Sequence, residues 1–326
     1  MGSNQAGAVR PGLHDRGVEA AVAISAGERA RAAIAELRPG QRFEGRYACL
    51  RKDRLTARNG GAYLSLELRD RTGTLAARVF READRIGLRF ERGDAVLARG
   101  KLERFRGELA AELDDVRRLE PGSFDPAEFL PAAYRSVEEL EGFLEHLCRE
   151  VHDPGLRGVV ERLVFAEPLA SDFRRAPCTR GGHHAYLGGL LEHTVSVGTL
   201  VGELCQLHPR LDSDLLMAAA LVHDVGKTRE FTYEAAFGVS DEGRLLGHLA
   251  IGAQMVAGAA GELPAERRLA LLHCVLSHHG SEAGPGRARQ GAGSGARGFA
   301  SAEALALYRL NALDASVKGA LEQGLG

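Results

Sequence analysis

A histidine and an aspartate, His223 and Asp224, stand side by side at the end of an apolar run over 215–222. The run is typical of a buried helix, where a charged side chain is costly unless another charge compensates it. Five further polar residues also close or interrupt apolar helical stripes: His193, His248, His278, His279 and Asp314. Helices that carry such residues can direct them into one shared pocket. We therefore expect a metal centre.

Imidazole and carboxylate ligands suit manganese, iron, zinc, nickel or cobalt better than calcium. We assign the following ligands to a first ion: His193, His223, Asp224 and Asp314. A second ion would take Asp224 as a bridge, together with His248, His278 and, as an open alternative, His279. Two ions about 4 Å apart can support an in-line displacement at phosphorus. The pattern therefore indicates a two-metal phosphohydrolase.

Residues beside these ligands are candidates for holding substrate phosphate. Lys227 follows Asp224 by three residues, close enough to hold a phosphate oxygen as a point charge. Its alternative role is that of a cation at a helix C-terminus. His183, His184 and Tyr186 come just before the helix of His193, and we assign them to substrate contacts, with a loop role as the alternative. Asp224, Lys227 and His184 are the candidate catalytic residues.

Five sequence segments together resemble one family. Residues 183–194 read HHAYLGGLLEHT, and they are accompanied by HDVGK at 223–227, GH at 247–248, SHHG at 277–280 and LDA at 313–315. These segments are similar to the signatures of the YhaM-type 3′→5′ exoribonucleases, and the resemblance covers roughly residues 39–318. It implies an OB-fold nucleic-acid-binding domain before an HD domain. It also implies a divalent metal, typically manganese, and trimming of RNA and single-stranded DNA from the 3′ end.

Two segments depart from the pattern of that family. The family usually has a Glu-aromatic-Gly-Ser-Pro stretch after SHHG, whereas this chain has residues 281–286 running into a glycine-rich insertion. The family also tends to have an acidic residue shortly before the final Leu-Asp-Ala. This chain has Asn311 there, between Leu310 and Ala312. The set of candidate metal ligands is complete despite both departures.

The composition is that of an ordinary globular protein, with 44% hydrophobic and 26% charged residues among 326. No apolar run approaches the ~18 residues of a membrane span, and no secretory signal precedes the first domain. The five cysteines are scattered, which favours reduced thiols and a cytoplasmic location. Residues 39–119 hold 19 basic against 13 acidic side chains. That excess indicates a surface facing a polyanion, or else an arginine-rich solvated surface.

The expected fold class is a multidomain α and β protein, with a small OB-type β-barrel before an all-α HD domain. Residues 1–38 read as a disordered tail with a short helix near 26–37, and residues 39–119 as the barrel. In the barrel we expect five strands, with a short helix between the third and the fourth. Residues 120–135 form a linker and 136–320 the helical phosphohydrolase domain. Residues 280–298 form a flexible glycine-rich insertion within it, or a basic flap over the nucleic acid.

Aromatic side chains of the barrel are candidates for stacking on bases. Tyr63 and Phe80 are assigned to substrate binding, and Tyr47 and Phe105 are further candidates. The alternative for each ring is packing within the barrel or at its edge.

The predicted activity is metal-dependent 3′→5′ exonuclease hydrolysis of single-stranded RNA, and also of single-stranded DNA, to nucleoside monophosphates. Two divalent ions are expected, with manganese first and iron, cobalt, nickel, zinc or magnesium as alternatives. The partners would be the nucleic acid, no membrane, and further copies of the chain through the helical domain. Two other functions stay open: a phosphohydrolase of a nucleotide or cyclic dinucleotide, and a catalytically inactive nucleic-acid-binding accessory protein.

Overall fold

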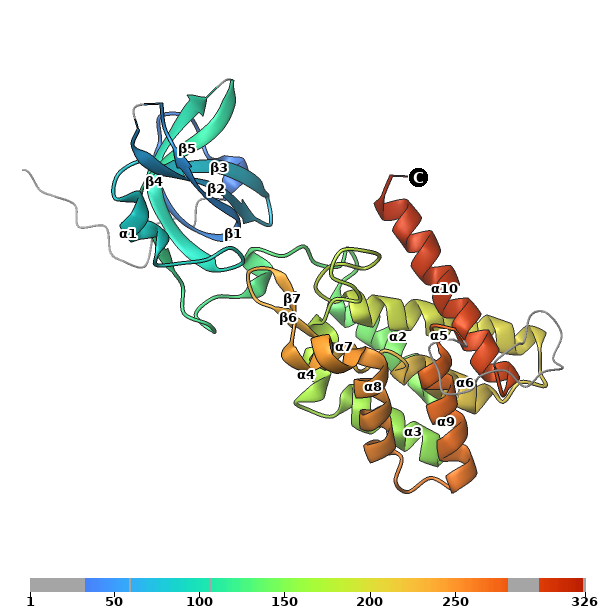
Figure 1. Ribbon diagram of the computed structural model, residues 1–326. Coiled ribbons are helices and arrows are strands. Elements are labelled where there is room, and N and C mark those ends of the chain that lie inside the picture. The colour runs from blue at the N-terminus through green and yellow to red at the C-terminus, as the bar shows by residue number, and fades with distance from the viewer. Residues whose placement is uncertain (1–32, 59, 106, 281–298, 325–326) are drawn as a thin grey trace, which may run out of the picture.

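The computed structural model describes residues 33–58, 60–105, 107–280 and 299–324, which form a β-barrel followed by a bundle of helices (Figure 1). This arrangement confirms the expected fold class. Most of the expected tail and nearly all of the glycine-rich insertion lie outside the described residues. The described end of the tail forms a short 3-10 helix, Ile34–Glu36. None of the helices described here is long and apolar enough to cross a membrane.

Five strands close the barrel in the order β1-β2-β3-β5-β4. They are β1 (Arg42–Thr56), β2 (Ala62–Asp70), β3 (Gly73–Val79), β4 (Ala95–Phe105) and β5 (Glu108–Arg118). A short helix, α1 (Ala83–Gly87), connects β3 to β4, as the sequence predicts. All neighbouring strands are antiparallel except β3 and β5, which run parallel.

The barrel core follows from the alternation of apolar residues along the strands. Leu64, Leu66 and Leu68 of β2 are all buried, while the residues between them are half-buried. Strand β1 pairs with β4 through its first half and with β2 through its second half, and a bulge lies between Cys49 and Arg51. Such a bulge bends a strand, which lets β1 contribute to both sides of the closed barrel.

The second part of the chain is mainly helical. Its helices are α2 (Val137–Arg149), α3 (Pro154–Val160), α4 (Leu169–Arg175), α5 (Gly189–Leu207), α6 (Ser213–Val222), α7 (Lys227–Glu230), α8 (Asp241–Ala259), α9 (Ala265–Ser277) and α10 (Ala302–Glu322). A π-helix, Glu161–Phe165, continues α3, and a 3-10 helix, Pro126–Glu128, lies before α2. One apolar core joins α2, α3, α5, α6, α8, α9 and α10. Its centre is α6, in which every residue from Leu215 to Val222 is buried.

Polar caps fix where the helices of the centre begin. The Asp212 side chain accepts a hydrogen bond from the amide of Leu215 and so starts α6, the helix that delivers His223 and Asp224. Ser240 and Ser301 cap α8 and α10 in the same way. Ser136 caps α2 by accepting a hydrogen bond from the amide of Glu139.

A β-hairpin interrupts the helical domain, so the prediction of an all-α domain is wrong at this point. It consists of β6 (Phe231–Tyr233) and β7 (Phe237–Val239), directly after α7. Its strands have three residues each, too few for the alternation of apolar and polar residues that identifies a strand.

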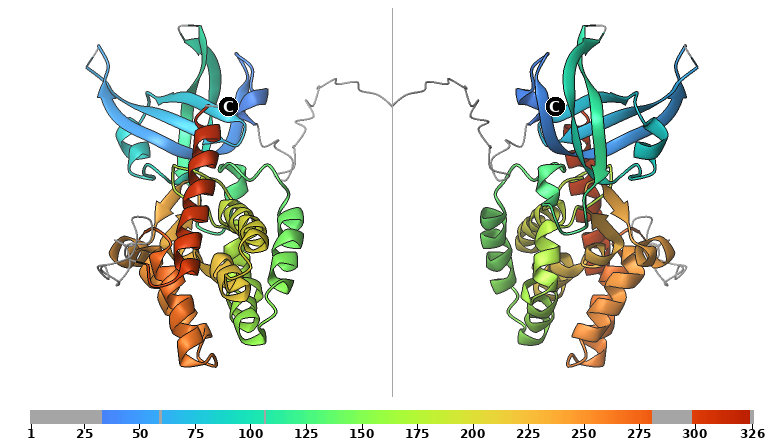
Figure 2. Two further views of the ribbon diagram at one scale, coloured as in Figure 1. Left: turned by 90° about the vertical axis from the view of Figure 1, so that its right-hand side faces the viewer. Right: turned by 90° about the vertical axis from the view of Figure 1, so that its left-hand side faces the viewer.

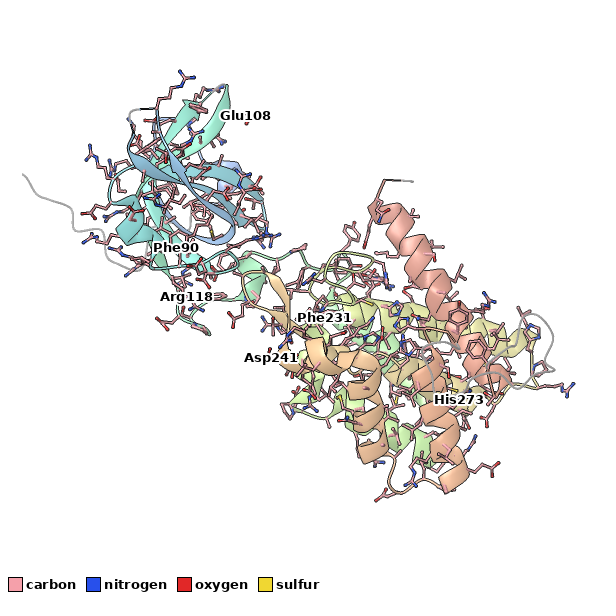
Figure 3. All side chains as sticks on the ribbon, viewed as in Figure 1. Phe90, Glu108, Arg118, Phe231, Asp241 and His273 are labelled. Atoms are coloured by element: carbon pink, nitrogen blue, oxygen red, sulfur yellow. The ribbon has the colours of Figure 1, made fainter. Side chains whose placement is uncertain are left out.

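The hairpin also links the two domains. Ala235 at its turn is fully buried in a small apolar cluster with Ala48, Ala95 and Phe129. The Arg69 guanidinium of the barrel donates a hydrogen bond to the Ala235 carbonyl, with 3.4 Å between Nη2 and O. Figure 2 shows the barrel seated above this part of the helical domain from two sides. In Figure 3, Arg118 lies at the barrel end near the hairpin residue Phe231, and Glu108 lies at the far end.

Candidate metal centre

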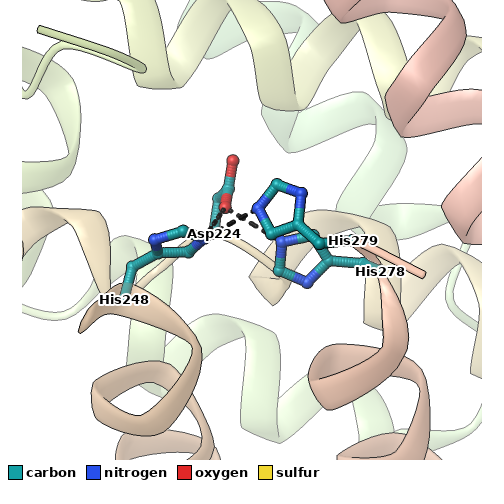
Figure 4. A group of neighbouring side chains, drawn as sticks. All are labelled: Asp224, His248, His278 and His279. Atoms are coloured by element: carbon teal, nitrogen blue, oxygen red, sulfur yellow. Dashed lines mark hydrogen bonds and ion pairs between the residues drawn. The ribbon is translucent and has the colours of Figure 1, made fainter. Parts of the chain in front are cut away.

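The histidines singled out in the sequence converge on Asp224. His193 lies in α5, His223 and Asp224 follow α6, His248 lies in α8, and His278 and His279 follow α9. Figure 4 shows His248 and His278 pointing toward the Asp224 carboxylate, with His279 beside them. Elements from across the helical domain therefore supply one cluster.

Three residues define a first metal position on one side of the carboxylate. Asp224 Oδ2 lies 3.6 Å from His193 Nε2 and 3.3 Å from His223 Nε2. The two Nε2 atoms are 3.2 Å apart. All three side chains are almost completely buried. Nitrogen and oxygen atoms this close around one point can hold a divalent cation.

A second position lies at the other carboxylate oxygen. Asp224 Oδ1 is 3.3 Å from His278 Nε2 and 3.7 Å from His248 Nε2, and His279 Nε2 is 2.9 Å from His248 Nε2. Within the described part of the chain, Asp224 Oδ1 and His278 Nε2 are buried atoms without a hydrogen-bond partner. Buried polar atoms are normally satisfied, so two such atoms facing each other fit a site for a cation.

Four of the histidines are oriented by a hydrogen bond at Nδ1, the outer ring nitrogen, which faces away from the cluster around Asp224. Nδ1 of His223 lies 2.7 Å from the Ala220 carbonyl, and Nδ1 of His278 lies 2.6 Å from the Val275 carbonyl. In the other two histidines the acceptor at Nδ1 is a carboxylate. Asp314 Oδ2 lies 2.6 Å from His193 Nδ1, and Glu230 Oε2 lies 3.0 Å from His248 Nδ1.

Acceptors of this kind require a proton on Nδ1, which leaves the lone pair of Nε2 directed into the cluster. Lone pairs that face each other at about 3 Å repel unless a cation lies between them. The donor set therefore fits divalent metal at both positions.

Two glycines permit the close approach of these elements. A side chain on Gly226, two residues after Asp224, would overlap the backbone carbonyl of His248. A side chain on Gly189, at the start of α5, would overlap the carbonyl of His184. The glycines of the HDVGK and HHAYLGG segments thus let α8 and the 183–188 loop reach the centre.

The electrostatics of the centre favour neutral imidazoles around an ionised carboxylate. Burial lowers the pKa of His278 to about 3 and that of His279 to about 4, because it disfavours the charged ring. Burial alone would raise the pKa of Asp224, but the charge of the Lys227 ammonium outweighs it and holds that pKa well below its usual range. Near pH 7 these side chains are in the form that binds metal.

Lys227 is part of the buried cluster. Its ammonium lies 2.6 Å from Asp224 Oδ2 and 3.4 Å from Cys178 Sγ, and the side chain is only 6% exposed. Burial alone would lower the pKa of Lys227, but the carboxylate raises it, so the lysine stays charged. In this structure its direct partner is the Asp224 carboxylate.

Asp314 lies in a different place from the one expected of a ligand to the first ion. Its Oδ2 contacts the outer nitrogen of His193 and also lies 3.0 Å from His184 Nε2. The His184 side chain is 1% exposed, and its Nδ1 lies 2.8 Å from the Tyr186 hydroxyl. That hydroxyl donates to Glu192 Oε2 at 2.5 Å. Asp314, His184 and Tyr186 thus form a network behind His193.

The remaining candidate residues are more accessible or lie in the barrel. His183 is half-buried, with Nε2 3.6 Å from Cys178 Sγ. Tyr63 and Phe80 pack against each other on the barrel with ring centroids 5.4 Å apart, and Phe80 is 47% exposed. Phe105 is exposed beneath the Arg78 guanidinium. Tyr47 is fully buried, so it belongs to the barrel core and cannot stack on a base.

Comparison with known proteins assigns both parts of the chain. Residues 49–119 match the model of the OB-fold nucleic acid binding domain, and residues 190–315 match that of the HD domain. The 3′-5′ exoribonuclease YhaM of Bacillus velezensis is 30% identical over 69% of this chain and 72% of its own length. The chain belongs to the YhaM family. The YhaM protein of Bacillus subtilis matches at the same identity and coverage, and that of Oceanobacillus iheyensis is 29% identical over 74% of this chain and 76% of its own.

Solved structures also align with a part of this YhaM family member. The second OB-fold domain of replication protein A from Methanococcus maripaludis aligns with a TM-score of 0.24 and 21% identity, over 29% of this chain and 98% of that one. The resemblance noted in the sequence is confirmed by the YhaM relatives and by the two domain models.

Four side chains of this YhaM family member contact the centre without having been expected there. The Glu230 carboxylate contacts Nδ1 of His248, and that of Glu192 accepts a hydrogen bond from the Tyr186 hydroxyl. Cys178 contacts Lys227. Asn311 Oδ1 lies 3.0 Å from the inward nitrogen of His193. Glu192 and Asn311 stand within three residues of an expected ligand, which is the one sequence signal that they offered.

Proposed function

We propose that this protein is a metal-dependent 3′→5′ exonuclease that hydrolyses single-stranded RNA, and single-stranded DNA as well, to nucleoside monophosphates. Its membership of the YhaM family supports the proposal, since the relatives carry the name 3′-5′ exoribonuclease. The two-domain organisation proposed for it is a barrel over 39–119, a linker over 120–135 and a phosphohydrolase domain over 136–320.

One observation carries the proposal beyond family membership. The two oxygens of a single buried carboxylate, Asp224, face two separate groups of imidazole nitrogens. A carboxylate placed in this way would hold two ions, and paired metal ions are common in enzymes that hydrolyse phosphodiesters. We propose His193, His223 and Asp224 for one ion, and Asp224, His248, His278 and His279 for the other.

When bound, the two ions would supply the Lewis acidity for an in-line displacement at phosphorus. Manganese is proposed because imidazole and carboxylate donors suit it. Asp224 would bind one ion through each carboxylate oxygen and so fix the two positions relative to each other. Lys227 would keep that carboxylate ionised and oriented. His183 would contact the substrate phosphate through a ring N–H, because its side chain is only half-buried beside Cys178 at the centre.

His184, Tyr186 and Asp314 would contribute through position. Asp314 contacts Nδ1 of His193 through its Oδ2, and His184 contacts the same carboxylate oxygen through Nε2. A carboxylate behind a ligating histidine fixes the ring and strengthens it as a donor. These residues would therefore orient the first metal position from behind.

The barrel would bind the strand that enters the centre. Phe80, with Tyr63 packed against it, offers an exposed aromatic surface, and aromatic rings stack on bases of any sequence. The hairpin of β6 and β7 runs from the Asp224 segment to the barrel, so it would hold the two domains in a fixed relation.

Self-association of copies through the helical domain is also proposed, because α10 exposes Leu313, Val317 and Leu321 along one helical face. Sedimentation of the purified protein measures it, and a monomer at every concentration contradicts it. A cytoplasmic location is proposed from the five free cysteines.

Product analysis tests the proposed activity. Uniformly labelled single-stranded RNA and DNA, mononucleotides and cyclic dinucleotides are each incubated with the protein and Mn²⁺, with and without a chelator. We expect nucleoside monophosphates from the strands and none in chelator. Intact strands together with hydrolysis of a cyclic dinucleotide would contradict the proposal, as would intact strands that the protein merely binds.

A further inference from the structure

Asn311 occupies the first metal position together with the two histidines there. It lies on α10, its side chain is buried, and its Oδ1 is 3.0 Å from His193 Nε2. That nitrogen also faces His223 Nε2 and Asp224 Oδ2. Asn311 Oδ1 therefore points at the atoms that define the first position.

The orientation of the Asn311 amide follows from its other contact. Nδ2 lies 3.2 Å from the backbone carbonyl of His278, which can only accept a hydrogen bond. The NH₂ group must face that carbonyl, so the oxygen of the amide faces His193. Because His193 Nδ1 is engaged by Asp314, its Nε2 carries a lone pair. Two acceptors therefore face each other at 3.0 Å, which a cation between them would resolve.

We propose that Asn311 is the fourth ligand of the first metal position, and that its neutral amide makes this position the weaker of the two, so that ions load the second position first. The inference rests on the proposed metal centre and adds an order of loading to it. In this proposal the neutral side chain of Asn311 on α10 sets the metal affinity of the first position.

The charges around the two positions support this order. At the first, the shared carboxylate oxygen already lies 2.6 Å from the Lys227 ammonium, which repels a metal ion. At the second, Asp224 Oδ1 has no hydrogen-bond partner among the described residues, and a further carboxylate, Glu230, stands behind His248. The second position also has three imidazoles, against two imidazoles and one amide at the first.

A purely structural role for Asn311 predicts different behaviour. The amide links α10 to the end of α9 through the His278 carbonyl, and that link alone would explain its burial. Asn311→Asp replaces the donor at this carbonyl by an oxygen, so a structural residue would lose stability without any gain in metal affinity. A ligand would instead gain a negative charge at the first position.

Calorimetric titration of the metal-free protein with Mn²⁺ separates these roles, supported by electron paramagnetic resonance of free Mn²⁺. We expect two unequal steps for the unaltered protein. Asn311→Asp should tighten the weaker step about ten-fold or more, which is ~1.4 kcal/mol, and leave the stronger step nearly unchanged. Asn311→Ala should lose the weaker step and keep one ion. The matched control is Ser316→Ala, an exposed position of the same helix, and it should bind as the unaltered protein does.

Circular dichroism and thermal unfolding of each variant establish that it folds. Two equal steps in the unaltered protein overturn the inference, as does an Asn311→Asp protein whose weaker step is unchanged or weaker still. If Asn311→Asp does not fold, Asn311→Ala decides, because two retained ions overturn the inference and one supports it. A folded protein that binds no Mn²⁺ at all refutes the proposed function itself, which distinguishes the two failures.

Discussion

Glu230 offers a sharp test of how the centre is held, because its carboxylate touches His248 twice. Oε2 lies 3.0 Å from His248 Nδ1, and Oε1 accepts from the His248 backbone amide at 3.3 Å. Burial alone would raise the pKa of Glu230, but the hydrogen bond that its carboxylate accepts from His248 outweighs burial and lowers that pKa. In Glu230→Gln the shape is kept, while one of the two acceptors becomes an NH₂ group that cannot accept.

The size of the effect follows from the bond that is lost. A hydrogen bond to a charged group contributes about 1.5–3 kcal/mol, and the carboxyl is 15% exposed, which favours the lower end of that range. About 1.5 kcal/mol corresponds to a roughly ten-fold weaker binding of metal at the second position. Carboxylates behind metal-bound histidines typically show losses of this order or up to about 100-fold.

The assay is calorimetric titration of metal-free protein with Mn²⁺, followed by the rate of RNA hydrolysis at limiting and at saturating Mn²⁺. We expect the tighter binding step to weaken and the rate to recover largely at saturating metal. Glu234→Gln is the matched control, since Glu234 is an exposed glutamate in the hairpin that follows. Unchanged Mn²⁺ affinity in Glu230→Gln, or an equal loss in Glu234→Gln, would refute the assigned role.

Three further outcomes are expected. Phe80→Ala should weaken binding of single-stranded RNA by about 1–3 kcal/mol and leave Mn²⁺ affinity intact; fluorescence anisotropy measures it, and unaltered RNA affinity contradicts the stacking role. Burial lowers the pKa of His278 from 6.5 to about 3, so the unfolded chain binds more protons below pH 6.5. The free energy of unfolding of the metal-free protein should therefore fall as the pH drops from 6.5 toward 4, by up to ~1.4 kcal/mol per pH unit from this residue. Urea unfolding measures this free energy, and equal values at pH 6.5 and pH 4 would contradict a buried, neutral His278. Removal of bound metal by a chelator should destabilise the protein, by about 2.7 kcal/mol relative to metal at 100 times its Kd; an unchanged melting temperature would show that the folded state does not hold the ions.

Much of the fold was predictable because local patterns agree with it. The leucines of β2 alternate as a half-buried strand requires, and Asp212, a residue type that favours helix N-caps, begins α6. The hairpin was missed because strands of three residues carry no recognisable period. Tyr47 shows a further limit, since an aromatic residue in a barrel strand can face the core or the solvent.

The positions around the centre show what sequence spacing can and cannot settle. His223 and Asp224 were predictable because polar residues at the end of a buried helix need compensation. Asn311 and Asp314 lie three residues apart on the same face of α10, so the sequence could not say which of them reaches the inward nitrogen of His193. Glu230 is distant in sequence from His248, and the two meet because close backbone contacts at Gly226 and Gly243 pack α7 against α8.

A time course on end-labelled strands tests whether the Asp224 centre carries a 3′→5′ exonuclease activity. Single-stranded RNA and DNA labelled at the 5′ end or at the 3′ end are incubated with the protein in Mn²⁺, beside Asp224→Asn purified free of host nucleases. We expect that 5′-labelled strands shorten stepwise while 3′ label is released at once as mononucleotide, with no cleavage by Asp224→Asn. Stepwise shortening of the 3′-labelled strand instead, or full activity in Asp224→Asn, would contradict it.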